Sequence, residues 1–215
     1  MAHPTMMAEM LATKLCHDLT GPIGAVNNGA EFISDEDFSM QGDALQLITD
    51  SAREASVRLQ FYRQSYGSIK GAGEVSLAEK KQLVSGFFKN SRIQVDWPDL
   101  YADAGNVSLA QRTSRLMLNM IIIVAGTMIK GGTLHIRIEQ DGDADKVITI
   151  KAEADVLKVD PEVLKILDRS SDAPEMSPKN VQVYFTANLV NELTVTLSHA
   201  HQDGTFSLIA RKSAA

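Results

Sequence analysis

Near the N-terminus a histidine and an acidic residue are adjacent, in the segment 15–23 with the sequence LCHDLTGPI. An imidazole with an unperturbed pKa of about 6.5 offers a neutral nitrogen nucleophile at neutral pH. A neighbouring carboxylate can accept a hydrogen bond from the other ring nitrogen, or help to remove the proton as the first nitrogen attacks. His17 and Asp18 therefore suit the acceptance of a phosphoryl group, with His17 as the acceptor and Asp18 as its orienter or base.

A long amphipathic helix over residues 5–33 is predicted to carry this pair. Its apolar residues recur at steps of three and four, namely Leu11, Leu15, Leu19, Ile23 or Pro22, Val26, Ala30 and Ile33. At about 100° per residue, His17 lies on the other side of the helix from most of them and points outward. Its neighbours on the outer face are short or positively charged. We expect receiver proteins to dock on Thr13, Lys14, Thr20, Gly21 and Gly24.

Each of these residues also has a plainer interpretation. An exposed histidine is most often a solvent-facing side chain, and a surface lysine is usually a solubilising charge. Gly21 and Gly24 can have the purely structural role of allowing close packing beside Pro22. Pro22 itself loosens the helix around His17, because it lacks an amide hydrogen. Cys16 diverges from His17 by about 100°, so we expect a small packed cysteine rather than a thiol dyad.

Composition limits the class of protein. The chain has 215 residues, of which 44% are hydrophobic and 22% charged, as in an ordinary soluble globular protein of one or two domains. Its net charge of −6 argues against nucleic-acid binding. The single cysteine fits a reducing cytoplasm. The chain starts without a signal-peptide pattern, and its most apolar run is too short to span a membrane, so we expect a soluble cytoplasmic protein.

The first domain, residues 1–70, is predicted to be a helical hairpin. After a turn over 34–42, a second helix runs to about Tyr66. Its apolar seam consists of Leu45, Ile48, Ala52, Ala55, Leu59 and Tyr62. Two antiparallel helices cannot enclose their own apolar stripes, so we expect two chains to form a four-helix bundle, as a homodimer.

Glycines over 67–73 predict a hinge into a second domain, residues 74–215. Capping boxes over 76–79 and 108–111 predict helices to about Asn90 and Lys130, the second ended by Gly131 and Gly132. Prolines predict helices over 161–168 and 178–193. Strands are predicted over 93–97, 133–140, 146–153, 194–200 and 205–211, with a turn at 141–143. The second domain is thus an α/β sandwich with helices on one face of a mixed sheet, and the whole chain is α+β.

Two segments resemble sensor histidine kinases. The sequence HDLTGPI at 17–23 is similar to their phosphoacceptor box, although Gly21 stands where many such kinases carry the Thr or Asn used for phosphatase activity. The segment 115–134 is similar to their ATP-binding, Bergerat-like domain, with Asn119 at the first Asn of that motif. Ile123, however, replaces the Asn that would hold magnesium, and an isoleucine offers no oxygen ligand. The glycine-rich elements for adenine and phosphate are missing as well, so no ATP binding is expected.

A kinase-like hairpin on a degenerate ATP-binding domain resembles the ChpT family of histidine phosphotransferases from alphaproteobacterial phosphorelays. The resemblance covers essentially the whole chain. It implies that His17 takes a phosphoryl group from the receiver aspartate of a CckA-like hybrid histidine kinase and passes it to CtrA-like and CpdR-like response regulators involved in the cell cycle. It also implies that Mg²⁺ is held by the receiver, with no cofactor or metal in this chain.

Two other functions remain open from the sequence. The chain could be a non-catalytic dimeric scaffold or kinase inhibitor, which would not need His17, or an active ATP-dependent kinase, which would need nucleotide binding. His135 is expected to face solvent or a helix flank. His199 and His201, with Asp203 nearby, weakly suggest a metal site, but no further ligand cluster accompanies them.

Overall fold

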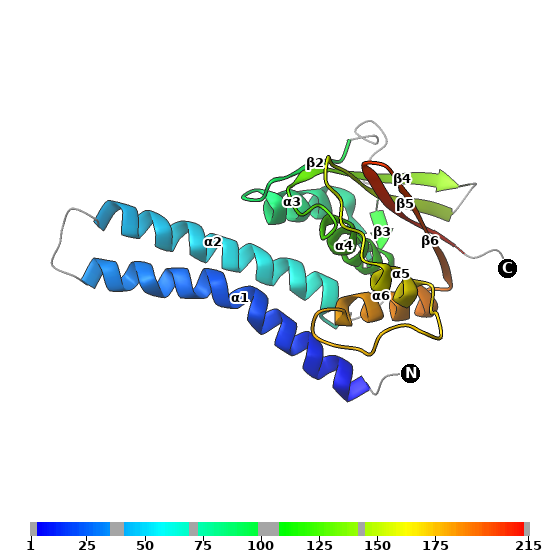
Figure 1. Ribbon diagram of the computed structural model, residues 1–215. Coiled ribbons are helices and arrows are strands. Elements are labelled where there is room, and N and C mark those ends of the chain that lie inside the picture. The colour runs from blue at the N-terminus through cyan, green and yellow to red at the C-terminus, as the bar shows by residue number, and fades with distance from the viewer. Residues whose placement is uncertain (1–3, 35–40, 69–72, 99–107, 142–144, 213–215) are drawn as a thin grey trace.

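The computed structural model describes residues 4–34, 41–68, 73–98, 108–141 and 145–212. Over these residues the chain is an α+β protein, with a pair of long helices followed by a mixed sheet and its helices, which confirms the predicted fold class (Figure 1). Most of the predicted loop over 34–42, most of the predicted hinge over 67–73 and most of the predicted turn over 141–143 lie outside the described residues.

Helices α1 (Pro4–Ser34) and α2 (Gln41–Tyr66) lie side by side and extend away from the rest of the molecule (Figure 1). Their close approach needs a glycine, because a Cβ at the buried Gly29 would lie 2.7 Å from the Ile48 side chain. Helix α1 bends partway along its length, and Pro22 supplies a cause (Figure 1). A proline lacks the amide that would bond to the carbonyl of Asp18, four residues earlier.

The second domain contains a five-stranded sheet. Its elements are β1 (Glu74–Ser76), α3 (Leu77–Phe88), β2 (Ile93–Asp96), β3 (Ser108–Ala110), α4 (Gln111–Ala125), β4 (Gly132–Asp141), β5 (Asp145–Glu153), α5 (Pro161–Leu167), α6 (Val181–Glu192), β6 (Val195–Gln202) and β7 (Thr205–Lys212). The strand order is β2-β4-β5-β7-β6, with β2 parallel to β4 and the other neighbours antiparallel. The helices cover one face of this sheet (Figure 1).

The core of the second domain lies between the sheet and α4. Side chains alternate between the two faces of a strand, so every second residue points to the helices. Among these inward residues, Leu134, Ile136, Ile150, Phe206 and Leu208 are fully buried. Helix α4 contributes Leu116, Leu118, Met120, Ile121 and Val124, also fully buried.

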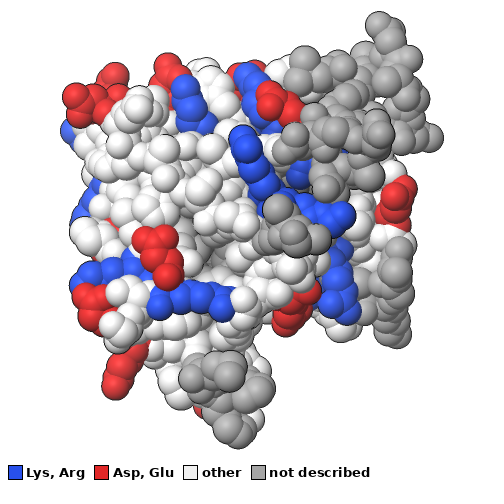
Figure 2. All heavy atoms as spheres, turned by 90° about the vertical axis from the view of Figure 1, so that its right-hand side faces the viewer, with Lys and Arg blue, Asp and Glu red and all other residues white. Residues whose placement is uncertain are grey.

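The outer surface of the second domain carries both signs of charge. On the side away from the hairpin, Lys and Arg side chains are interspersed with Asp and Glu (Figure 2). The outer face of the sheet has a local cluster in which Arg137 and His135 both contact the Asp96 carboxylate, at 2.5 and 2.7 Å. None of the described helices is both long enough and apolar enough to cross a membrane.

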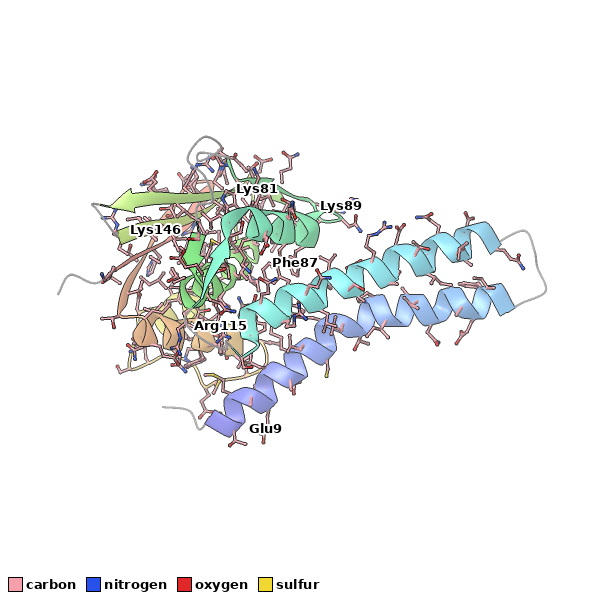
Figure 3. The ribbon with its side chains drawn as sticks, turned by 180° about the vertical axis from the view of Figure 1, so that it is seen from behind. Glu9, Lys81, Phe87, Lys89, Arg115 and Lys146 are labelled. Atoms are coloured by element: carbon pink, nitrogen blue, oxygen red, sulfur yellow. The ribbon has the colours of Figure 1, made fainter. Side chains whose placement is uncertain are left out.

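The hairpin packs firmly onto the second domain where α2 ends. The buried ring of Phe61 lies 4.2 Å, between centroids, from Phe87 of α3. Arg115 of α4 donates a hydrogen bond to the carbonyl of Gly67, and Figure 3 places Arg115 and Phe87 along this junction. Asn119, also on α4, donates to the carbonyl of Ser65 at 3.0 Å. A carbonyl in the last turn of α2 and one just after the helix therefore find their partners on the second domain.

The predicted capping box at 108–111 is wrong. Ser108 lies in β3, which pairs antiparallel with β1, and its hydroxyl donates to Glu74 on that strand. Helix α4 consequently begins at Gln111 with no side-chain cap. The helix also ends at Ala125 rather than near Lys130. Just after its end, the Thr127 hydroxyl donates to the carbonyl of Val124 at 2.7 Å.

Two further boundaries differ from the prediction. Helix α6 starts at Val181 instead of Pro178, because the Asn180 side chain closes a turn by accepting from the amide of Ser177 at 2.7 Å. Gly131 and Gly132 do not end α4; they lead into β4 with φ angles of +93° and +151°. A Cβ at Gly131 would lie 2.3 Å from the carbonyl oxygen of Arg92, so this turn requires glycine.

Candidate functional site

His17 projects from α1 into open space, as the sequence predicts. Its side chain is 88% exposed, and its Nδ1 lies 3.4 Å from Oδ1 of Asp18. This distance is longer than an ordinary hydrogen bond, so the contact orients the ring only loosely. Nε2 is the ring nitrogen left free for a reacting group.

Asp18 is much more restrained than His17. It lies on the side of α1 that faces α2, and its side chain is only 18% exposed. Its Oδ2 accepts two hydrogen bonds, one from Lys14 Nζ at 2.9 Å and one from the Tyr62 hydroxyl of α2 at 2.9 Å. Both donors bind the same oxygen, which leaves Oδ1 directed to His17.

The electrostatics keep this carboxylate charged. Burial alone would raise the pKa of Asp18, but the hydrogen bond and charge of Lys14 and the hydrogen bonds from Tyr62 and His17 outweigh it, so the pKa lies below its usual value. The pKa of Tyr62 is raised, by burial and by the negative charge of Asp18. Tyr62 therefore keeps its proton and acts as a donor to Asp18.

The other predicted docking residues surround His17 with few side-chain obstacles. The hydroxyls of Thr13 and Thr20 donate to carbonyls of their own helix, at 2.9 and 2.8 Å. A Cβ at Gly21 or at Gly24 would meet no heavy atom within 4 Å, so packing within this chain does not require either glycine. Lys14 is half-buried, because its ammonium group is held in the ion pair with Asp18.

Cys16 differs from the prediction of a packed cysteine, because it is exposed. It lies two turns before Ile23, on nearly the same side of α1, and the Ile23 side chain is 56% exposed. The helix thus has an open apolar side that is separate from the side that carries His17.

Tyr62 is the residue of this site that the sequence did not identify. The periodic pattern places it in the apolar seam of α2, and its ring is indeed buried. Its partner Asp18 is 44 residues away along the chain. A tyrosine in an apolar seam does signal a hydroxyl that needs a partner, but that signal does not say which one.

The segment that resembles a nucleotide site is packed with protein side chains. Asn119 is fully buried, and its Nδ2 donates to the carbonyls of Ser65 and Arg115. Gln182 of α6 donates to the backbone carbonyl of Asn119 at 3.2 Å. Ile123 is buried in the core. Asn119 therefore joins the hairpin to the second domain.

The other histidines that the structure describes have structural partners. His135 contacts Asp96 at 2.7 Å and Glu153 at 3.3 Å on the outer face of the sheet. His199 contacts Asp168, next to α5, at 3.1 Å. His201 lies near the ring of Phe206. In the part of the chain that the structure describes, no group of three or more His, Cys, Asp or Glu side chains is placed to hold a metal ion.

The site combines an exposed histidine with an anchored carboxylate on a helical hairpin that is joined to an α/β domain. Comparisons with known proteins assign this arrangement to the histidine phosphotransferases. Residues 77–205 match the family model described as the histidine phosphotransferase C-terminal domain. The chain is 32% identical over 194 residues to the protein phosphotransferase ChpT of Brucella abortus (strain 2308), covering 89% of this chain and 88% of that protein.

One solved structure of a phosphotransferase agrees with this assignment, and a histidine kinase structure is more distant. A bacterial phosphotransferase superposes with a TM-score of 0.83 at 28% identity, covering 98% of each chain. The histidine kinase AdeS of Acinetobacter baumannii is more distant, with a TM-score of 0.48 and 13% identity over 92% of this chain and 97% of that one. The chain belongs to the histidine phosphotransferase family and is a ChpT-type member of it.

Proposed function

We propose that His17 is the phosphoacceptor of a phosphorelay. It receives the phosphoryl group from the phosphoaspartate of a hybrid kinase's receiver domain and returns it to the aspartate of a downstream response regulator. The observation that carries this proposal is the geometry of His17, 88% exposed beside a carboxylate that is held by Lys14 and Tyr62. Transfer in both directions needs an accessible nitrogen and a fixed counter-charge, and the site has both.

Receivers dock around His17 in this proposal. Gly21 and Gly24 leave space for close approach, and Thr13 and Thr20 are exposed beside them. Lys14 contributes positive charge near the incoming phosphoryl group while it holds Asp18. Mg²⁺ is held by the carboxylates of the receiver, because this hard cation prefers oxygen ligands.

The phosphoryl group comes from another protein and not from bound ATP. Support for this comes from the buried state of Asn119 and from the isoleucine at position 123, which has no oxygen to offer a metal ion. A nucleotide would have to displace Gln182, which bonds to Asn119 across the α4–α6 contact.

We also propose that two chains associate through their hairpins. Several large apolar side chains are exposed there, including Ile23 on α1 and Leu45 and Leu59 on α2. Leu45, Ala52 and Leu59 recur every seven residues, which is the spacing of a helix-packing seam. A second copy would cover this stripe and leave His17 accessible, because His17 lies about 120° around α1 from Ile23.

Labelling experiments test the phosphoacceptor. The protein is incubated with radiolabelled ATP alone, and then with ATP plus the hybrid kinase and its receiver domain. We expect label only in the second mixture, and complete loss of label in His17→Ala. His201→Ala is the matched control, because it removes another exposed imidazole, on β6. Label in the first mixture would indicate a kinase, whereas label retained in His17→Ala, or no label in either mixture, would refute the relay.

A further inference from the structure

Tyr62 occupies a position that the phosphoacceptor chemistry can use. It comes from the opposite helix of the hairpin, yet its hydroxyl lies 2.9 Å from Oδ2 of Asp18. Its ring is buried and packs among Phe61, Tyr66 and Phe87, with the Tyr66 ring stacked at 5.9 Å. Such packing holds the side chain in one place and so fixes the position of its hydroxyl oxygen.

Asp18 has only one free oxygen because of this contact. Lys14 and Tyr62 both donate to Oδ2, and Oδ1 faces Nδ1 of His17 at 3.4 Å. Lys14 is attached to the same helix and holds Asp18 by a flexible side chain. Tyr62 is fixed to α2, so it sets the orientation of the carboxylate relative to the whole hairpin.

We propose that Tyr62 is a positioning residue for phosphoryl transfer, acting on His17 through Asp18. This proposal rests on the proposed function of His17. With Oδ1 held opposite Nδ1, the favoured tautomer of the imidazole has its proton on Nδ1 and a lone pair on Nε2. Tyr62 thereby shifts the tautomer equilibrium toward Nε2 as the nucleophile.

The transfer step is balanced without further groups. Nε2 donates its lone pair to phosphorus while the bond from phosphorus to the receiver's aspartate oxygen breaks, and that aspartate leaves with the electron pair. The ring keeps its Nδ1 proton and gains a positive charge, which the Asp18 carboxylate compensates. In the reverse step an aspartate of the next receiver attacks phosphorus, and the electron pair returns to Nε2. No proton has to leave Nδ1 in either direction.

The chain offers a closely matched control. Tyr66 lies one turn further along α2, and its hydroxyl is buried without a hydrogen-bond partner among the described residues. Tyr66→Phe deletes the same atom as Tyr62→Phe but removes no bond to Asp18. Asp18→Asn gives the effect of losing the carboxylate charge itself.

The first measurement uses the unphosphorylated full-length protein. Nitrogen-15 NMR of the His17 ring reports the share of each tautomer, and carbon-13 NMR of the Asp18 carboxyl reports its titration. Besides His17 and Tyr62, the charged groups near Asp18 are Lys14 on α1 and Arg58 on α2, which lies close to the Tyr62 hydroxyl. In Tyr62→Phe we expect a smaller share of the Nδ1–H tautomer and a higher pKa of Asp18; Tyr66→Phe should match wild type in both.

The second measurement is the single-turnover rate from the phosphorylated receiver domain of the hybrid kinase to His17. Tyr62→Phe should slow transfer about tenfold, a small part of the rate advantage that well-positioned reacting groups can supply. Tyr62→Phe combined with Asp18→Asn should be no slower than Asp18→Asn alone, because both act through one carboxylate.

Three results would overturn this role for Tyr62. They are a rate for Tyr62→Phe within twofold of Tyr66→Phe, an unchanged His17 tautomer, or rate losses that multiply in the double variant. Failure of the proposed function is separate, because it appears as an unlabelled wild-type protein. The NMR measurements on the unphosphorylated protein still decide whether Tyr62 positions the ring.

Discussion

The hairpin and the second domain bury their apolar side chains to very different extents. Ten of the fifteen residues of α4 are buried, whereas over residues 5–33 of α1 only Gly29 is. Nine large hydrophobic side chains are exposed among the described residues. Only Ile129 and Val156 of these belong to the second domain; the hairpin has the other seven, Met6, Ile23, Phe32, Ile33, Leu45, Leu47 and Leu59.

The difference concerns how fully each part encloses its own apolar side chains. The second domain has a closed core between its sheet and α4, of the kind that stabilises an independent domain. The hairpin joins the core of that domain near its base, where Phe61 and Tyr62 are buried in it and Leu15 and Tyr66 pack against it. Further out it has an open apolar stripe on one side and His17 on another, so its surface is built for contacts with other chains.

Breaking the open stripe gives the largest expected effect. Leu59→Glu places a charge where Leu59 is 58% exposed in the single chain. Burial of a leucine contributes about 1.5–3 kcal/mol. A symmetric dimer loses it twice, so the dissociation constant should rise roughly 100-fold or more. Analytical ultracentrifugation over a concentration series measures this shift.

A neighbouring charge controls for this prediction. Gln60→Glu adds the same charge at an exposed, already polar position about 100° around α2 from Leu59. We expect its dissociation constant to stay within a few-fold of wild type. If Leu59→Glu associates as tightly as Gln60→Glu, the stripe is not the surface through which two chains meet.

Damage to the closed core should act on stability alone. Ile150 is fully buried in the middle of β5, and Ile150→Ala should lower the free energy of unfolding by about 2–5 kcal/mol. Thr149→Ala, on the outer face of the same strand, should cost less than about 1 kcal/mol. Urea unfolding measures both. Below the unfolding transition Ile150→Ala should still accept phosphate on His17, and loss of acceptance in the folded variant would contradict the separation of the two regions.

Long periodic patterns made much of the fold predictable. The apolar spacing around Leu11 to Ile33 placed a helix over 5–33, and α1 spans Pro4–Ser34. Alternation on either side of the 141–143 turn placed the β4–β5 pair within one or two residues. The outward direction of His17 follows from the same helical period, which needs no knowledge of the rest of the chain.

Contacts between distant segments were not predictable in the same way. The pairing of β1 with β3 joins three-residue strands that are more than thirty residues apart, and it overrides the local preference of Ser108 for a helix cap. The hydrogen bond from Tyr62 to Asp18 spans 44 residues. Neither contact leaves a periodic signal, because each depends on how whole elements pack.

The junction between the two regions gives the smallest of the expected effects. Asn119→Ala removes the donor to the carbonyl of Ser65, near the end of α2, and leaves that carbonyl buried without this partner. The cost should be about 1–3 kcal/mol in the free energy of unfolding. Asn188→Ala is the control, because that exposed asparagine donates only weakly across the same two regions, to the sulfur of Met7 at 3.9 Å, and its loss should cost under about 0.5 kcal/mol. Equal costs for the two variants would mean that Asn119 does not hold the hairpin to the second domain. A larger loss for Asn119→Ala, together with faster hydrogen exchange in the last turn of α2, would show that the residue at the remnant nucleotide motif stabilises the junction.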